Sequence, residues 1–171
     1  MELSILVLPL LASVISGFFG RYIGDRNSEI VTSLLVSIAA VFSFIVFYNV
    51  IVNQYETNIT LATWISSGSL DVNWSMKIDP LSAVMLVVVT SVSALVHIYS
   101  IGYMSHDPHK PRFMAYLSLF TFAMLMLVTS DNFIQLFFGW EGVGLCSYFL
   151  IGFWFKKDTA NAAAIKAFVV N

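Results

Sequence analysis

Long apolar stretches dominate the pattern of hydrophobic and polar positions along the chain. Several reach the roughly 20 residues that a helix needs to cross the hydrocarbon core of a bilayer. A further apolar segment, opening near residue 159, is shorter. The pattern predicts an all-α polytopic membrane protein with five transmembrane helices and the start of a sixth, at residues 3–20, 29–52, 80–104, 112–130, 133–155 and 159–171.

Polar residues and prolines mark the ends of these helices. Asp79-Pro80 places an N-cap residue directly before a proline at the first helical position. Polar residues at 131–132 separate the fourth helix from the fifth, and Asp158-Thr159 offers caps for the sixth. The whole chain is therefore predicted to form a single membrane domain, residues 1–171.

One segment departs from the helical pattern. Residues 70–78, "LDVNWSMKI", alternate between apolar and polar positions, which is typical of a half-buried strand. Ser67-Gly68 can turn the chain back along the preceding "ITLATWIS". A short extramembrane β-hairpin is predicted at about 59–78, between helices 2 and 3. The alternative is that Trp64 and Trp74 simply lie at the membrane interface.

The composition agrees with a membrane protein. Hydrophobic residues make up 58% of the chain and charged residues 11%, whereas a soluble domain is about a quarter charged. The net charge of −2 gives no reason to expect a nucleic-acid partner. The single cysteine, Cys146, excludes an internal disulfide and cannot hold an iron–sulfur cluster, which needs about four ligands. Membrane lipid is the expected surrounding.

The basic residues predict an orientation. If the N-terminus faces outward, the inner loops lie at 21–28, 105–111 and 156–158, and the outer loops contain only Lys77 as a basic residue. Cytoplasmic-side loops of membrane proteins carry the excess of lysine and arginine. The inner loops and their edges hold Arg21, Arg26, Lys110, Arg112, Lys156 and Lys157.

A single acidic residue interrupts the fifth apolar stretch. Glu141 lies near mid-depth in "FFGWEGVGLCSYFLIGFWF", residues 137–155. Acidic residues inside membranes are costly and usually belong to ion paths, proton relays or buried pairs. Two interpretations follow: Glu141 transfers protons or ions, or it is a neutral, hydrogen-bonded acid that joins two helices. The surrounding glycines permit close helix approach or room for water.

Two further residues are candidates for the same chemistry. Lys166 lies about seven residues into the sixth helix, which should run antiparallel to the fifth, so it could be an accessory member of a polar chain. Alternatively, its amine could extend to the inner interface. His97, in the third helix, is either a satisfied structural residue or a relay. The loop "YMSHDPHKPRF" contains histidine and aspartate but no defined metal-ligand spacing, so neither a metal nor a cofactor site is predicted.

The sequence resembles a known family. "LPLLASVISGFFGR", "HIYSIGYMSHDPHKPRFMAYLSLFTFAMLMLVTSDN" and "FIQLFFGWEGVGLCSYFLIGFWF" closely resemble NADH:ubiquinone oxidoreductase chain 5, the distal antiporter-like membrane subunit of respiratory complex I. The resemblance implies proton transfer across the membrane, coupled to NADH oxidation and ubiquinone reduction elsewhere. NADH, FMN, iron–sulfur clusters and ubiquinone would then be bound by other subunits. Glu141 matches the family's proton-path glutamate, and Lys166 matches a lysine of its sixth helix.

The resemblance also implies partners and a location. The family's later helices, with its central lysine and histidines, have no counterpart in this sequence, so a second chain is expected to supply them. Other complex I membrane-arm subunits are the expected partners. The mitochondrial inner membrane is expected, with the N-terminus toward the intermembrane space; a bacterial plasma membrane is the alternative. Two other functions stay open: a purely architectural assembly fragment, or part of a multisubunit cation/proton antiporter.

Overall fold

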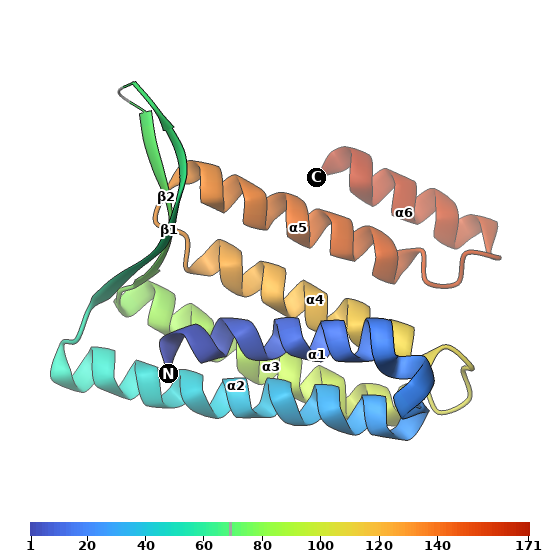
Figure 1. Cartoon of the computed structure of the whole chain (residues 1–171). Coiled ribbons are helices and arrows are strands. Elements are labelled where there is room, and N and C mark those ends of the chain that lie inside the picture. The colour runs from blue at the N-terminus through green and yellow to red at the C-terminus, as the bar shows by residue number, and fades with distance from the viewer. Residues whose placement is uncertain (69) are drawn as a thin grey trace.

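The computed structural model describes residues 1–68 and 70–171, and it is mostly helical (Figure 1). A two-stranded hairpin separates the second helix from the third. The elements in chain order are α1 (Glu2–Ile23), α2 (Asp25–Asn53), β1 (Thr57–Ser67), β2 (Leu70–Ile78), α3 (Pro80–Tyr103), α4 (Lys110–Val128), α5 (Phe133–Ile151) and α6 (Asp158–Val170).

The helices form a bundle that is open on one side. Helices α1 to α4 pack on one another, α5 packs on α4, and α6 packs on α5 at the outer edge (Figure 1). The hairpin lies at one end of the bundle. The α1–α2, α3–α4 and α5–α6 connections lie at the opposite end, which we call the basic end because Arg21, Arg26, Lys110, Arg112, Lys156 and Lys157 are all at or beside these connections.

The predicted transmembrane helices are confirmed. In the described residues, five helices (α1 to α5) are long and apolar enough to cross a membrane. The bounds differ from the predicted ones by more than two residues in two places. The fifth helix was predicted to end at 155 but ends at Ile151. The next residue, Gly152, caps it and donates its N–H to Tyr148 O at 2.9 Å. The loop predicted at 21–28 is helical except for Gly24.

Gly24 explains why the connection between α1 and α2 is so short. Its φ is +87° and its ψ is 161°, a backbone conformation that is essentially restricted to glycine. A single residue in this conformation reverses the chain. The sequence pattern did not reveal this, because the polar residues around Gly24 are typical of a loop as well as of an exposed helix end.

The cap predicted for α3 is present, α5 has a cap that was not predicted, and the cap predicted for α6 is absent. Asp79 caps α3 by accepting a hydrogen bond from Ser82 N–H at 2.8 Å, and Asn132 caps α5 by accepting one from Gln135 N–H at 2.9 Å. The prediction that Asp158 caps α6 is wrong. Asp158 is the first residue of the helix, and Lys157 occupies the cap position.

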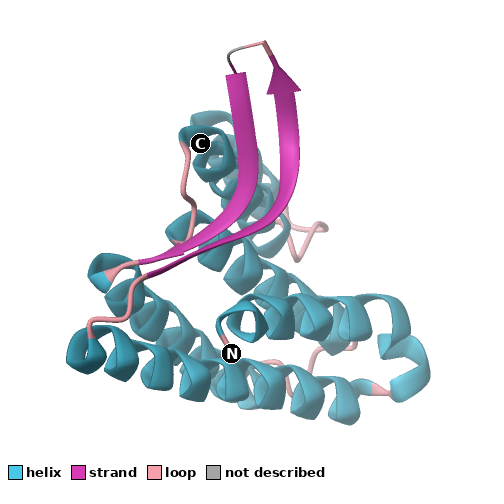
Figure 2. Cartoon of the chain, turned by 60° about the vertical axis from the view of Figure 1, so that its left-hand side comes forward, coloured by secondary structure: helices cyan, strands magenta, loops and turns pink. Residues whose placement is uncertain are grey.

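The hairpin is confirmed. Strands β1 and β2 pair antiparallel from Thr57↔Ile78 to Ser67↔Leu70, with two irregularities in β1. In β2 the apolar residues Val72, Met76 and Ile78 are buried, as the alternation predicted. The hairpin extends well beyond the helices (Figure 2), and its base packs against the α4–α5 connection.

The interior changes character along the bundle. Near the hairpin, the core is apolar and includes Ile5, Val50, Met76, Leu86 and Leu125. Farther from the hairpin, many buried residues are small or polar. Several of their hydroxyls donate to the carbonyl four residues earlier, which satisfies them where a membrane offers no water; examples are Thr32, Ser43, Thr90 and Ser100.

Candidate functional site

Glycines on one face of α5 allow it to pack closely on α4. A Cβ at Gly139 would lie 2.7 Å from the backbone of Leu127, and one at Gly142 would lie 3.2 Å from Ala123 Cβ. Side chains at these positions would push the two helices apart. The glycines that surround Glu141 in the sequence therefore serve helix packing, one of the two roles that the sequence left open.

A second face of α5 packs on α6. Gly144 lies directly against the Asn171 side chain, and Trp140 Nε1 donates to Asn171 O at 3.2 Å. Farther along, the rings of Tyr148 and Phe168 lie 5.6 Å apart in an edge-on arrangement. These contacts run along one side of each helix, so the two helices are antiparallel neighbours, as predicted.

Glu141 lies on neither of these faces. It is exposed, near the middle of α5, within a stripe of exposed apolar residues that includes Phe137, Phe138 and Leu145. Within residues 1–68 and 70–171, no hydrogen bond or ion pair reaches its carboxylate. The interpretation of Glu141 as a hydrogen-bonded joint between α5 and a neighbouring helix therefore has no partner residue in this part of the chain.

The pairing of α5 with α6 places Lys166 away from Glu141. Tyr148 lies against Phe168 and Gly152 against Ala164, so Lys166 is level with residue 150 of α5. Residue 150 is about nine residues from Glu141, or about 14 Å along the helix axis at 1.5 Å per residue. Lys166 is thus much closer to the basic end than Glu141 is.

Lys166 also lies on the wrong face of α6 to approach Glu141. Ala164 and Phe168 face α5. Lys166 is two residues from each, so it is rotated by about 200° and lies on the opposite side of the helix. The side chain is exposed there. The structure therefore does not bring together the two candidate residues that the sequence predicted.

His97 is fully buried between α3 and α4. Its Nδ1 lies 2.8 Å from Ser93 O and its Nε2 lies 3.0 Å from Ser118 Oγ. A carbonyl can only accept, so Nδ1 carries the proton and Nε2 accepts from the Ser118 hydroxyl. Both ring nitrogens are satisfied in the neutral form, which favours the structural interpretation of this histidine.

Sequence reasoning missed an ion pair at the basic end. Glu29 in α2 has a side chain that is only 6% exposed, and its Oε1 lies 3.7 Å from Lys110 Nζ at the start of α4. Nearby, Ser16 Oγ donates to Pro111 O at 2.8 Å. Glu29 is an acidic residue at the start of a predicted transmembrane helix, and its position could have indicated that a basic partner lies nearby.

The loop between α3 and α4 is held to the loop after α5. Asp107 accepts hydrogen bonds from Trp154 Nε1 at 3.0 Å and from His109 N–H at 2.8 Å. One carboxylate oxygen of Asp107 thus joins the two loops at the basic end, and the other holds the turn within the α3–α4 loop.

Within the described residues, five membrane-crossing helices and a hairpin between the second and third define a polytopic helical membrane protein. Residues 64–114 match the family described as NADH-Ubiquinone oxidoreductase (complex I), chain 5 N-terminus. Residues 130–171 match the family described as NADH:quinone oxidoreductase/Mrp antiporter, TM. The chain belongs to the chain 5 family of complex I.

Individual relatives agree with this assignment. The chain is 56% identical over 171 residues to NADH-ubiquinone oxidoreductase chain 5 of Arabidopsis thaliana, and 56% identical over 169 residues to that of Phytophthora infestans. It is 55% identical over 175 residues to NADH-quinone oxidoreductase subunit L of Rhodobacter capsulatus. These alignments span 98–100% of this chain but only 24–26% of the relatives, so the chain spans about a quarter of their length.

A solved structure shares the fold. It is a chain in the membrane-bound sulfane sulfur reductase (MBS), an archaeal respiratory membrane complex. The match has a TM-score of 0.82 at 16% sequence identity and covers 99% of this chain and 34% of the other. At this identity the likeness concerns the arrangement of the helices and the hairpin.

Proposed function

We propose that this chain is the N-terminal portion of a proton-translocating membrane-arm subunit of complex I, with Glu141 as a protonatable site. One observation carries the proposal: an ionisable side chain lies at mid-helix on the open face of α5, away from both α4 and α6. A charged carboxylate facing lipid would be costly. Glu141 is therefore expected to face other helices or a hydrated cavity.

The chemistry of a carboxylate suits this position. It holds a proton when its surroundings are apolar and releases the proton when water or a cation approaches. The stripe of Phe137, Phe138 and Leu145 around Glu141 supplies apolar surroundings. Helices from the remaining three quarters of a chain 5 relative, on the same or a second polypeptide, would supply the water and the cation. Lys166 is then an accessory residue nearer the basic end.

The proposed coupling assigns the redox chemistry to other subunits. NADH oxidation and ubiquinone reduction would take place there, and this chain would respond by transferring protons. Its partners would be the other membrane-arm subunits. The proposed location is the mitochondrial inner membrane, with the basic end inside and the hairpin in the intermembrane space, because basic residues concentrate on the inner side.

A second function is supported by a different observation. The contacts of α5 are built for packing: Gly139 and Gly142 fit against α4, and Gln135 binds the hairpin. A purely architectural role would need no ionisable group at position 141. The two functions therefore differ in what they predict for the removal of that group.

The test is Glu141→Gln in the assembled complex, with Glu56→Gln as the matched control. Glu56 is an exposed residue between α2 and β1. We expect Glu141→Gln to lower NADH-driven proton pumping in sealed membrane vesicles while the complex assembles normally on native gels. Unchanged pumping with normal assembly would refute the proton-transfer role and support the architectural one.

A further inference from the structure

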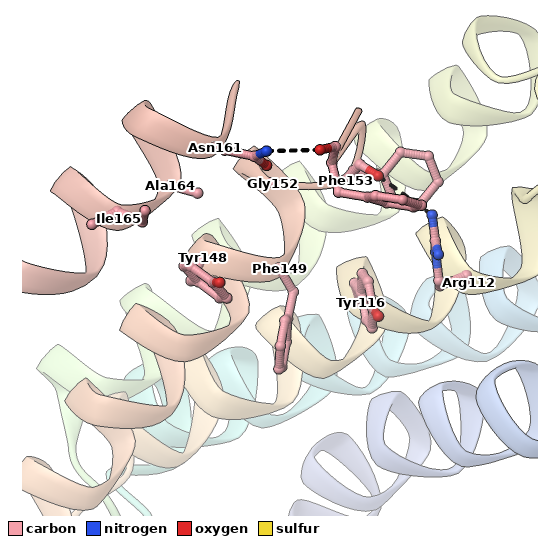
Figure 3. A pocket seen from close by; sticks show the side chains of 10 residues that line it. Arg112, Tyr116, Tyr148, Phe149, Gly152, Phe153, Asn161, Ala164 and Ile165 are labelled. Atoms are coloured by element: carbon pink, nitrogen blue, oxygen red, sulfur yellow. Dashed lines mark hydrogen bonds between the residues drawn. The ribbon is translucent and has the colours of Figure 1, made fainter. Parts of the chain in front are cut away.

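A pocket of about 430 Å³ opens at the basic end between α4, α5 and α6 (Figure 3). Its walls are mostly aromatic and aliphatic, with a few polar groups. The residues that line it include Arg112 and Tyr116 from α4, Tyr148 and Phe149 from α5, and Asn161 and Ile165 from α6. It lies far from Glu141 along α5, so what binds here is a separate question from the proton path.

Arg112 is the charged group of this pocket, and four of its five N–H donors have no partner within the described residues. Its guanidinium stacks 4.7 Å from the centre of the Phe153 ring and 5.7 Å from that of Phe155, and Nη2 donates to Phe153 O at 3.3 Å. Its Nε is buried and has no hydrogen-bond partner in the described part of the chain. An arginine offers five N–H donors in a rigid fork that matches phosphate.

No carboxylate among the described lining residues neutralises this charge. Lys156 and Lys157 in the α5–α6 connection add positive charge, of which Asp158 at the start of α6 offsets one unit. Asn161, the fourth residue of α6, already donates its side-chain N–H to Phe155 O at 2.7 Å. The electrostatics of the pocket therefore select an anionic ligand.

The position of the pocket indicates that part of its ligand is apolar. Arg112 is in the first turn of α4, at the end of a membrane-spanning helix, where lipid headgroups meet the hydrocarbon core. Tyr116, Phe149 and Ile165 extend the pocket from there toward the middle of the bundle. A ligand that satisfies both features has a phosphate at one end and a hydrocarbon chain at the other.

We propose that this pocket binds an anionic phospholipid, with its phosphate on Arg112 and an acyl chain along Tyr116, Phe149 and Ile165. Basic pockets between transmembrane helices at the inner leaflet favour such headgroups. The aromatic stack holds the guanidinium in place before the lipid arrives, so little side-chain entropy is lost on binding. The lipid would in turn join α4 to α6 at the basic end.

The test uses the chain in its native membrane assembly, purified and stripped of lipid with detergent. A phosphatidylglycerol carrying a photoactivatable acyl chain is titrated in, and cross-linking to this chain is measured. Phosphatidylcholine with the same acyl chain reports on headgroup charge, and inorganic phosphate is the competitor that separates a lipid from a free anion. Mass spectrometry of cross-linked peptides locates the site.

We expect saturable labelling by phosphatidylglycerol in the pocket, with Arg112→Gln weakening it by about tenfold to a hundredfold, the range for a hydrogen bond to a charged group. Arg112→Lys keeps the positive charge but lacks the forked guanidinium, so its affinity for the probe should lie between those of the wild type and Arg112→Gln. Ile165 lines the pocket and is half exposed, so the larger side chain in Ile165→Trp should occupy the space of the acyl chain and abolish labelling. This variant leaves Arg112 in place, so it tests the pocket even if Arg112→Gln perturbs the α5–α6 connection. Lys77→Gln, in β2 at the hairpin end of the molecule, should leave the affinity unchanged.

Three results would overturn the proposal. Equal labelling by phosphatidylcholine would show that the pocket does not recognise an anionic headgroup. Wild-type affinity in both Arg112→Gln and Ile165→Trp would place the lipid elsewhere. Full displacement of the probe by inorganic phosphate at concentrations near that of the lipid would identify a free anion as the ligand. Each of these readouts is independent of proton pumping, so the role of Glu141 is judged separately.

Discussion

Gln135 and Ser75 form a reciprocal pair of hydrogen bonds that joins α5 to the hairpin. Ser75 N–H donates to Gln135 Oε1 at 3.0 Å, and Gln135 Nε2 donates to Ser75 O at 2.7 Å. The amide thus takes the place of a neighbouring strand for one residue of β2. Both residues are buried, with exposures of 1% and 2%, so neither backbone group of Ser75 can turn to water instead.

Replacing Gln135 with leucine should release the hairpin from α5. The substitution keeps the approximate size of the side chain and leaves two buried backbone groups of Ser75 unpaired, at about 1–3 kcal/mol each. Gln135→Glu is the matched control, because its carboxylate can still accept from Ser75 N–H. We expect amide exchange at residues 72–78 to accelerate strongly in Gln135→Leu and less in Gln135→Glu. Equal exchange in Gln135→Leu and wild type would contradict this role.

The sequence predicted the elements of the fold because their signals are local. Apolar length gives α1 to α5, period-two alternation gives β2, and Asp79 gives the start of α3. Each depends on a few neighbouring residues. The conformation of Gly24 is also local, but the residues around it do not distinguish a one-residue turn from a longer loop. The start of α2 was therefore predicted at 29, although the helix begins at Asp25.

Contacts between elements were not predictable in the same way. The rotation and register of α6 against α5 decide that Lys166 lies about 14 Å along the axis from Glu141 and on the far side of its helix. No spacing within the sequence fixes that register. Gln135 was passed over for the same reason: an amide in an apolar helix has meaning only once its partner Ser75, on another element, is known.

Removing the imidazole of His97 should separate α3 from α4 more than it affects catalysis. His97→Phe keeps an aromatic ring but leaves the buried Ser118 hydroxyl without its partner, which should cost about 1–3 kcal/mol. We expect a lower midpoint of unfolding in detergent and normal turnover of the molecules that remain folded. A large loss of proton pumping at unchanged stability would instead identify His97 as a relay.

The ion pair between Glu29 and Lys110 should stabilise the junction of α2 and α4. Lys110→Met leaves the buried Glu29 carboxylate without a counter-charge, whereas Glu29→Gln together with Lys110→Met removes both charges. We expect the single substitution Lys110→Met to destabilise more than the double one, with a coupling energy of about 0.5–3 kcal/mol. Unfolding of all four proteins in the cycle measures it. Additive effects would show that the 3.7 Å contact contributes no coupling.

Asp79 should make the start of α3 sensitive to acid. The hydrogen bond from Ser82 N–H lowers the pKa of Asp79 below its usual value, and nearby Lys77 acts in the same direction. A lowered folded-state pKa means that the stabilisation is complete above the unfolded-state pKa of about 4 and is lost as the pH falls through the folded-state value. Asp79→Asn still accepts the bond but does not titrate. The protection factor of the Ser82 amide, which corrects for the intrinsic pH dependence of exchange, should therefore fall in acid in the wild type and stay constant in Asp79→Asn.

Adding one methyl group at Gly139 should displace α5 from α4. The new Cβ would lie 2.7 Å from the Leu127 backbone, which cannot move as a flexible side chain could. Overpacking of this kind costs about 1–3 kcal/mol. Gly102→Ala is the matched control, because open space surrounds that position in α3 and alanine favours a helix by about 1 kcal/mol over glycine. Unfolding midpoints should fall for Gly139→Ala and hold or rise for Gly102→Ala. Because Glu141 lies on the same helix, Gly139→Ala should also lower proton pumping, whereas unchanged pumping with a lowered unfolding midpoint would show that the α4–α5 contact does not position the carboxylate.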